Sequence, residues 1–218
     1  MNLESKKKRG DFIKRKILGA LISTMILLCP IQVQAQNKAQ IKAQINNALK
    51  ETYEMLEQEY YENIKLEEFD IVGHSGIKTY ESYRLLTAYA QKDLQDICQT
   101  DDDGLRLYDD RFCVAVGTAF NMSVGQYFDV ELSNGFVIKC IVGDIKADQH
   151  TDSQNIFTKH NGCCTEFIVD SKKLPKCVKT IGDISTLCED FDAPVVKIIT
   201  YDYNILEERS KNECYASN

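Results

Sequence analysis

The stretch Val137-Ile-Lys-Cys-Ile-Val-Gly143-Asp144-Ile-Lys146-Ala-Asp148-Gln-His150-Thr-Asp152-Ser153 decides how the chain folds. Its first half is an apolar run rich in β-branched residues, which predicts a buried strand that ends at Gly143. Its second half is polar and holds several carboxylates, a lysine and a histidine. A packed strand followed by a polar loop often aims reactive side chains, so we expect a functional site to begin here.

Neighbouring runs extend this strand into a sheet. Residues 127–132 alternate between apolar and polar, Ser133-Asn134-Gly135 is a strong hairpin signal, and residues 136–142 return as the partner strand. Further strands are expected over residues 113–118, 165–169 and 194–203. Because no helical pattern separates these strands, residues 105–204 are predicted to form a mainly β domain, a small six-stranded, closed or half-closed β-barrel.

The region before this domain, residues 36–104, is predicted to be helical. Apolar side chains recur at three- and four-residue intervals over residues 37–63, and a second helix is expected over residues 79–97. The apolar stripe of the first helix is typical of a packing face. At the other end of the chain, residues 205–218 are expected to form a charged tail.

The acidic segment Thr100-Asp-Asp-Asp-Gly104 follows the second expected helix. Aligned with an EF-hand loop, its aspartates would take two ligand positions, but Gln99 falls on the first position and Asp110 on the last. The alternative is a surface turn in which aspartates bond their own backbone and glycine supplies a positive φ. Turn chemistry favours the second interpretation.

Residues 1–35 have the features of a targeting segment. A basic start precedes an apolar run over residues 17–28, and small residues at 33 and 35 have the spacing of a cleavage site. We therefore expect a signal peptide and an exported protein, extracellular or on the cell-envelope surface. The alternative is an uncleaved membrane anchor over residues 17–33, which would be the protein's only expected membrane contact.

The charge of the chain argues against nucleic-acid binding. Of 26 basic and 33 acidic side chains, residues 1–35 hold seven and two, so the remainder carries a net charge of −12. Such a surface repels phosphate backbones, and no basic patch interrupts it. The same remainder holds eight cysteines without a Cys-x-x-Cys pair, which permits disulfides and disfavours a zinc ribbon.

Several of these segments together resemble a known family. Cys113-Val-Ala-Val-Gly-Thr118, Val124-Gly125 before a strand, the Asn134-Gly135 hairpin, Ile141-Val-Gly-Asp144 and Glu166-Phe-Ile-Val-Asp170 follow one another in the order of the double-psi β-barrel. More narrowly, the order is similar to the three-aspartate (3D) domain of bacterial cell-wall proteins, such as resuscitation-promoting factors and lytic transglycosylase A-like enzymes. The resemblance implies a peptidoglycan-cleaving activity, with glycan strands as the partner.

The resemblance also implies where catalytic carboxylates lie. Asp144 stands at the first aspartate of the family's motif, although Ile145-Lys-Ala-Asp148 replaces its Thr-Gly-Gly-Ala segment. Glu166 takes the second acidic position, after an insertion. A lytic transglycosylase needs one carboxyl group, which first protonates the departing oxygen and then acts as base while the sugar's own 6-hydroxyl attacks. We expect Asp144 to be that acid/base.

The remaining candidates surround Asp144 in the sequence. Asp152 and Glu166 are expected to be catalytic by binding sugar hydroxyls or modulating the proton of Asp144, and Lys146 is expected to orient the group. Asp148 and His150 complete the expected substrate-binding set. The alternative interpretation makes Asp144 a turn residue after Gly143 and the others part of a solvated loop.

Other arrangements have weaker support. His150 and His160 with neighbouring carboxylates or Cys163 fit no standard zinc spacing, so no metal and no cofactor is expected. A Cys-His nucleophile built from the same segment lacks a recognisable context. The alternative function is a non-catalytic binding module for wall glycan or a protein partner, because a fold alone does not confer activity. The sequence leaves the oligomeric state open.

Overall fold

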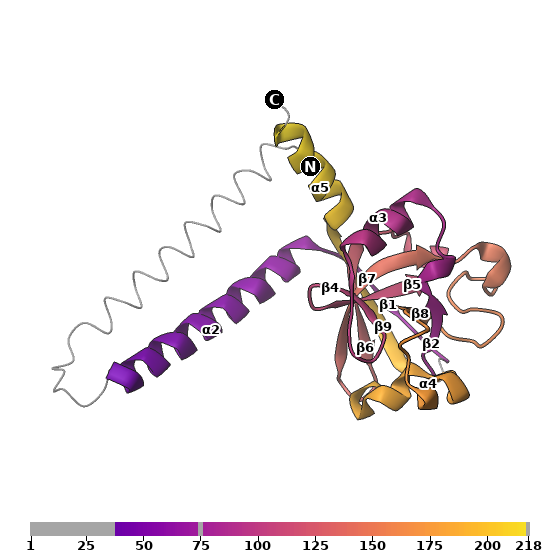
Figure 1. Ribbon diagram of the computed structural model, residues 1–218, viewed down its shortest axis with the longest axis horizontal. Helices are drawn as coiled ribbons and strands as arrows, with labels where there is room; N and C mark the ends of the chain where they lie inside the picture. The colour runs from indigo at the N-terminus through magenta and orange to yellow at the C-terminus, as the bar shows by residue number, and fades with distance from the viewer. Residues whose placement is uncertain (1–37, 74–75, 217–218) are drawn as a thin grey trace. The chain divides into compact units, whose positions relative to one another are not determined.

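The computed structural model describes residues 38–73 and 76–216 (Figure 1). A boundary between two compact units falls between Asn63 and Ile64. The expected signal peptide or anchor over residues 1–35 lies outside the described part of the chain. Within that part, none of the helices combines the length and the apolar character that crossing a bilayer requires.

The first unit contributes one long helix, α2 (Lys38–Ile64). The helix predicted over residues 37–63 is therefore confirmed. Its sequence holds no Gly or Pro, and Lys50 and Glu54 form an ion pair one turn apart. Tyr53 and Met55 are exposed, at 59% and 68% of their surface.

The second unit is built on one mixed sheet of nine strands (Figure 1). The strands are β1 (Lys65–Asp70), β2 (Thr79–Ser82), β3 (Gln99–Thr100), β4 (Arg106–Tyr108), β5 (Arg111–Val116), β6 (Gln126–Leu132), β7 (Val137–Ile145), β8 (Thr165–Val169) and β9 (Val195–Asn204). Their order is β1-β9-β6-β7-β5-β4-β3, and β8 pairs with both β5 and β2. Most pairings are antiparallel, but β5 runs parallel to β7 and β2 runs parallel to β8.

The mainly β prediction is confirmed, but the six-stranded barrel is not. The sheet has nine strands in the described residues and is not closed. Four strands were not expected, β1 to β4, and they lie before or at the start of the segment predicted to be β. In the sheet, β1 is added beside β9, β2 beside β8, and β4 with β3 beside β5. The strands β1 and β2 are extended because they pair with β9 and β8, which are distant in the sequence.

The hairpin between β6 and β7 forms at the predicted place. Gly135 adopts a positive φ of 84°, and its N–H donates to the carbonyl of Leu132 at 2.9 Å. The side chain of Asn134 accepts from the N–H of Phe136 at 3.0 Å. The register Tyr127↔Ile141 follows from this turn and fixes which face of β7 each side chain occupies.

Helices cover the sheet at both ends in the view of Figure 1. The helix α3 (Tyr89–Ile97) packs beside β7. In the sequence, α4 (Lys176–Ile181) and the short 3-10 helices η4 (Ile184–Leu187) and η5 (Glu189–Phe191) lie between β8 and β9. The helix predicted over residues 79–97 is wrong in its first half, because Thr79 to Ser82 pair with β8 as a strand. The expected tail contains a helix, α5 (Ile205–Ala216).

The core lies on one face of the central strands. Alternate residues of β5, Val114 and Val116, point into it together with Phe128 of β6 and Phe167 of β8. Fully burying such side chains contributes about 1.5–3 kcal/mol each. The opposite face of the same strands carries Cys113 and Ala115, which are also buried.

A buried ion pair links the centre of the sheet. The Nη1 of Arg111 donates to Oδ1 of Asp129 at 2.7 Å, and the hydroxyl of Tyr201 donates to Oδ2 of the same carboxylate at 2.7 Å. The guanidinium also lies 4.4 Å from the ring centre of Tyr127. These contacts join β5, β6 and β9 through polar groups that burial makes costly to separate.

Candidate functional site

A group of charged side chains lies at the ends of β7 and β8 and on β2. We call Glu81, Asp144, Lys146 and Glu166 the carboxylate cluster. Its assembly follows from strand register, because Ala115 of β5 pairs with Asp144 on one side and with Glu166 on the other. Residues at the same register position share a face of the sheet. Asp144 and Glu166 therefore lie on the same face, although they are 22 residues apart in the sequence.

Gly143 allows this register. A Cβ at this position would lie 2.8 Å from Cγ1 of Ile168 and 3.4 Å from Cβ of Cys113. The pairing of β5 with β7 shifts next to it, between Val114 and Ala115. The irregularity at Gly143 therefore turns Asp144 onto the same face as Ala115.

Lys146 lies between two carboxylates. Its Nζ donates to Oε2 of Glu81 at 2.9 Å and also contacts Oε2 of Glu166. All three side chains are largely buried, with exposures of 11% for Lys146, 21% for Glu81 and 14% for Glu166. The backbone N–H of Lys146 donates to the carbonyl of Val116 at 2.8 Å, which ties the end of β7 to β5.

Glu166 is held on its second oxygen as well. Its Oε1 accepts from the hydroxyl of Thr79 at 3.0 Å and from Nδ2 of Asn161 at 3.2 Å. Thr79 faces Glu166 because the two residues are partners in the parallel pairing of β2 with β8. Both oxygens of this carboxylate therefore have protein partners.

Asp144 is held by α3. The Nε2 of Gln91 donates to Oδ1 of Asp144, while Oε1 of Gln91 accepts from the N–H of Ala88 at 2.8 Å. Gln91 thus satisfies an unpaired amide at the start of α3 and fixes the carboxylate with the other end of its amide. The side chain of Asp144 remains partly exposed.

The pKa of Glu81 is raised, mainly because the side chain is buried. Asp144 and Glu166 raise this pKa further, against the lowering effect of Lys146. One lysine cannot neutralise three carboxylates. Burial by itself would lower the pKa of Lys146, but Glu166 and Glu81 outweigh it and the pKa is raised. The Oε1 of Glu81 is buried and accepts no hydrogen bond from the described residues.

The other predicted site residues lie in the loop of residues 147–163, and their contacts are outside the carboxylate cluster. Asp148 accepts from the hydroxyl of Thr118 at 2.6 Å and is exposed. His150 is exposed and lies 3.3 Å from the side-chain amide of Gln149. Asp152 accepts from the N–H groups of Ile156 and Phe157, at 2.8 Å and 3.0 Å.

These contacts divide the predicted set in two. Lys146 contacts Glu166, and Asp144 lies at the matching register position across β5, where Gln91 binds its carboxylate. The carboxylate of Asp152 instead binds the backbone of its own loop, and the hydrogen bond with Phe157 leads the causes that lower its pKa. Asp148 ties the start of the loop to residues after β5.

Sequence reasoning missed Glu81. The residue belongs to the segment 79–97 that was expected to be helical, whereas it lies in a four-residue strand. A signal was present, because Thr79 and Tyr80 have high β-propensity, but the segment is too short for its period to be read.

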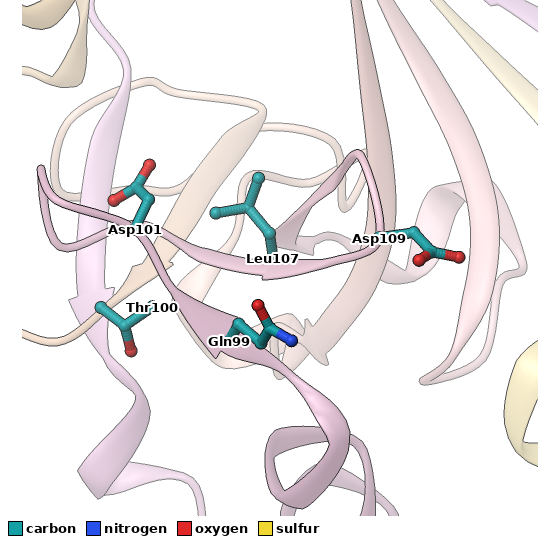
Figure 2. A pocket seen from close by; sticks show the side chains of 5 residues that line it. All are labelled: Gln99, Thr100, Asp101, Leu107 and Asp109. Carbon is teal, nitrogen blue, oxygen red and sulfur yellow. The ribbon is translucent and has the colours of Figure 1, made fainter.

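A pocket of about 380 Å³ lies elsewhere, beside β3 and β4 (Figure 2). It is lined by Gln99, Thr100, Asp101, Leu107 and Asp109. Asp101 begins the expected acidic turn, and its Oδ1 accepts from the N–H of Leu105 at 2.7 Å.

The acidic segment is a turn between β3 and β4, as turn chemistry predicted. Gly104 adopts a positive φ of 88° there, and burial raises the pKa of Asp101. Across residues 38–73 and 76–216, no group of three or more His, Cys, Asp and Glu is arranged to hold a metal ion.

Comparisons with known proteins do not assign the chain. No protein-family model matches it, and no curated protein matches it either. The resemblance to the 3D domain therefore stays a prediction.

Proposed function

We propose that the protein is an exported, cell-wall-active protein that cleaves peptidoglycan glycan strands at the carboxylate cluster. The observation that carries the proposal is Glu81, a buried carboxyl with a raised pKa and an unbonded oxygen, next to the carboxylate of Asp144. Acid catalysis of glycoside cleavage needs a carboxyl group that still holds its proton near neutral pH. Burial and the neighbouring carboxylates shift the pKa of Glu81 in that direction.

The reaction uses one proton in a cycle. The carboxyl group donates it to the glycosidic oxygen as the bond from that oxygen to the anomeric carbon breaks. The 6-hydroxyl of the same sugar then bonds to the anomeric carbon and returns its proton to the carboxylate. We assign this proton to Glu81 in place of Asp144, whose carboxylate helps to keep the pKa of Glu81 raised. Lys146 and Glu166 position Glu81.

The double-psi resemblance belongs to this proposal. Its support is the parallel pairing of β5 with β7 inside a largely antiparallel sheet, with Asp144 and Glu166 at matching positions on either side of β5. Export rests on the features of residues 1–35, and wall location rests on the resemblance.

A second candidate is a binding module for wall glycan without turnover. The observation that favours it is the saturation of Lys146 and Glu166, whose charged atoms are already bound within the protein. Charged groups that are bound within the protein stabilise the fold and have fewer free atoms with which to contact a reacting substrate.

Digestion of purified sacculi, with mass spectrometry of the soluble products, tests the proposal. The protein should release anhydro-muropeptides, and Asp144→Asn and Glu81→Gln should each lower release by about 10²–10⁴-fold. Release should also fall as pH rises through the raised pKa of Glu81, because the acid form is lost. Asp110→Asn is the matched control, since this carboxylate is exposed and pairs with Lys139.

Three outcomes contradict the proposal in different ways. Unchanged release from both site variants removes the carboxylate cluster from catalysis. Sedimentation with sacculi and no soluble product supports the binding module. Failure of both release and sedimentation removes the wall glycan as the partner.

A further inference from the structure

Two thiols from different elements touch inside the second unit. The Sγ atoms of Cys98 and Cys113 lie 3.2 Å apart. Both residues are buried, Cys113 completely and Cys98 with 9% of its surface exposed. Cys98 is the residue that ends α3, and Cys113 lies within β5. The contact therefore joins the helix that holds Asp144 to the strand in the middle of the sheet.

The fold holds both sulfurs in place. The N–H of Cys98 donates to the carbonyl of Leu94 at 3.1 Å, which fixes the end of α3. Between the two cysteines the chain forms β3, β4 and the start of β5, and each strand pairs with the next. This meander brings Cys113 back to Cys98 at the end of α3, 15 positions later in the sequence. Neither sulfur depends on a long loop for its position.

We propose that Cys98 and Cys113 are an oxidation site, where thiol–disulfide exchange with a disulfide oxidant closes a bond between them. The sulfurs need only move from 3.2 Å to about 2.05 Å. An exported chain meets disulfide oxidants, and an even number of cysteines is typical of such chains. The proposal rests on the proposed export but not on the proposed wall activity.

The exchange is balanced in two steps. The thiolate of Cys98 attacks one sulfur of the oxidant, whose other sulfur leaves as a thiolate. The thiolate of Cys113 then attacks Cys98 in the mixed disulfide and releases the second sulfur of the oxidant. Two protein thiols are oxidised, one oxidant disulfide is reduced to two thiols, and these take up the two protons.

The surroundings select Cys98 as the first nucleophile. The hydrogen bond with Cys113 lowers the pKa of Cys98, and the charge of Arg106 adds to this against the effect of burial. The same contact, with burial, raises the pKa of Cys113 well above its usual value. Arg106 is fixed for this role, because its Nε donates to Oε1 of Gln95 at 2.8 Å. The thiolate is the reactive form.

Other described cysteines have different partners. Cys163 donates to the carbonyl of Ile77 at 3.1 Å, and Cys140 donates to the carbonyl of Ile138 at 3.5 Å. Cys177 is exposed on α4. A random oxidation would start at the exposed thiol, so a bond between two buried cysteines is a specific prediction.

Peptide mapping tests the pairing directly. The purified protein is incubated with oxidised glutathione, its free thiols are alkylated, and it is digested with trypsin. Cys98 then lies in the peptide 93–106 and Cys113 in the peptide 112–139, each as the sole cysteine. Mass spectrometry should find these two peptides linked, and linked no longer after reduction. Separately alkylated peptides, or linkage of either to another cysteine, would overturn the proposal.

Thermal unfolding gives a second measurement that needs no variant. Closing this loop should raise the Tm of the oxidised protein over the reduced protein by about 6–12 °C. Cys98→Ala should abolish the redox-dependent shift, whereas Cys177→Ser should keep it. If Cys98→Ala does not fold, the wild-type difference and the peptide map still decide. A shift that persists in Cys98→Ala, or equal Tm values in both states of the wild type, contradicts the assignment.

Discussion

The carboxylates that follow Gly143 in the sequence fall into two groups with different partners. Asp144 and Glu166 lie at matching positions on either side of β5, and their partners come from distant parts of the sequence. Gln91 binds Asp144, and Lys146 binds both Glu166 and Glu81. Asp148 and Asp152 lie in the loop of residues 147–163 and bind nearby hydroxyl or backbone groups. Asp144, Asp148 and Asp152 are close together in the sequence, but the fold gives them different partners, while it brings the distant Glu166 to the register position of Asp144.

The difference follows from what fixes each side chain. A strand fixes the direction of every second side chain, so charges can be forced together and their pKa values shifted. A loop has to satisfy its own backbone, and aspartate is well suited to accept from amides a few residues away. Acidic residues at strand ends are therefore better site candidates than equally dense acidic residues in the loop that follows.

The largest expected effect comes from removing the shared cation. Lys146→Met leaves Glu81 and Glu166 buried without a counter-charge, and should lower the free energy of unfolding by about 3–5 kcal/mol in urea denaturation at pH 7. Lys159→Met is the matched control in the loop, since its Nζ is exposed and contacts only the carbonyl of Gln149 among described groups. Equal losses from the two variants would erase the distinction between the regions.

An intermediate effect is expected where the loop meets β5. A Cβ on Gly117 would lie 1.9 Å from the carbonyl oxygen of Asn155, which is backbone and cannot turn away. Gly117→Ala should therefore cost about 1–3 kcal/mol and displace the loop. At Gly76 the nearest atoms to such a Cβ are 3.9 Å away, so Gly76→Ala should be near neutral. Chemical denaturation of both variants checks this, and a neutral Gly117→Ala would show that the loop does not pack there.

The smallest effect is expected from the loop aspartate. Asp152→Ala should speed amide hydrogen exchange at Ile156 and Phe157, which lose their acceptor, with little change in global stability. Because the folded pKa of Asp152 is lowered, its contribution is present above the unfolded value of 3.8 and is lost as pH falls through the folded value. Loss of glycan cleavage in this variant, with unchanged exchange, would return Asp152 to the catalytic set.

Much of the sheet could be predicted from the sequence. The alternation in β6, the Asn134-Gly135 turn and the apolar run of β7 are local signals, and each strand formed where its period indicated. The strands β1 and β2 escaped notice because Lys65–Asp70 is highly charged and Thr79–Ser82 is short. Their extended form comes from pairing with β9 and β8, which no local window contains.

The site, like the sheet, could be predicted only in part from the sequence. Lys146 and Glu166 could be placed with Asp144 because strand ends and a resemblance pointed to them. Glu81 could not, since its role depends on the parallel pairing of β2 with β8, in which the partners Thr79 and Glu166 are 87 positions apart in the sequence. The contact of Cys98 with Cys113 was hidden for a similar reason, because hydrophobic patterning assigns both residues to the core without saying which thiols meet.

The place of β9 governs when the fold can be completed. This strand is the last in the sequence, yet it lies between β1 and β6 and pairs with both. Until residues 195–204 emerge, β6 has an open edge and β1 has no neighbour in the sheet. Such long-range closure slows folding and exposes edges that invite association. A chain that crosses a membrane from its N-terminus would therefore stay incomplete until nearly its whole length has been delivered.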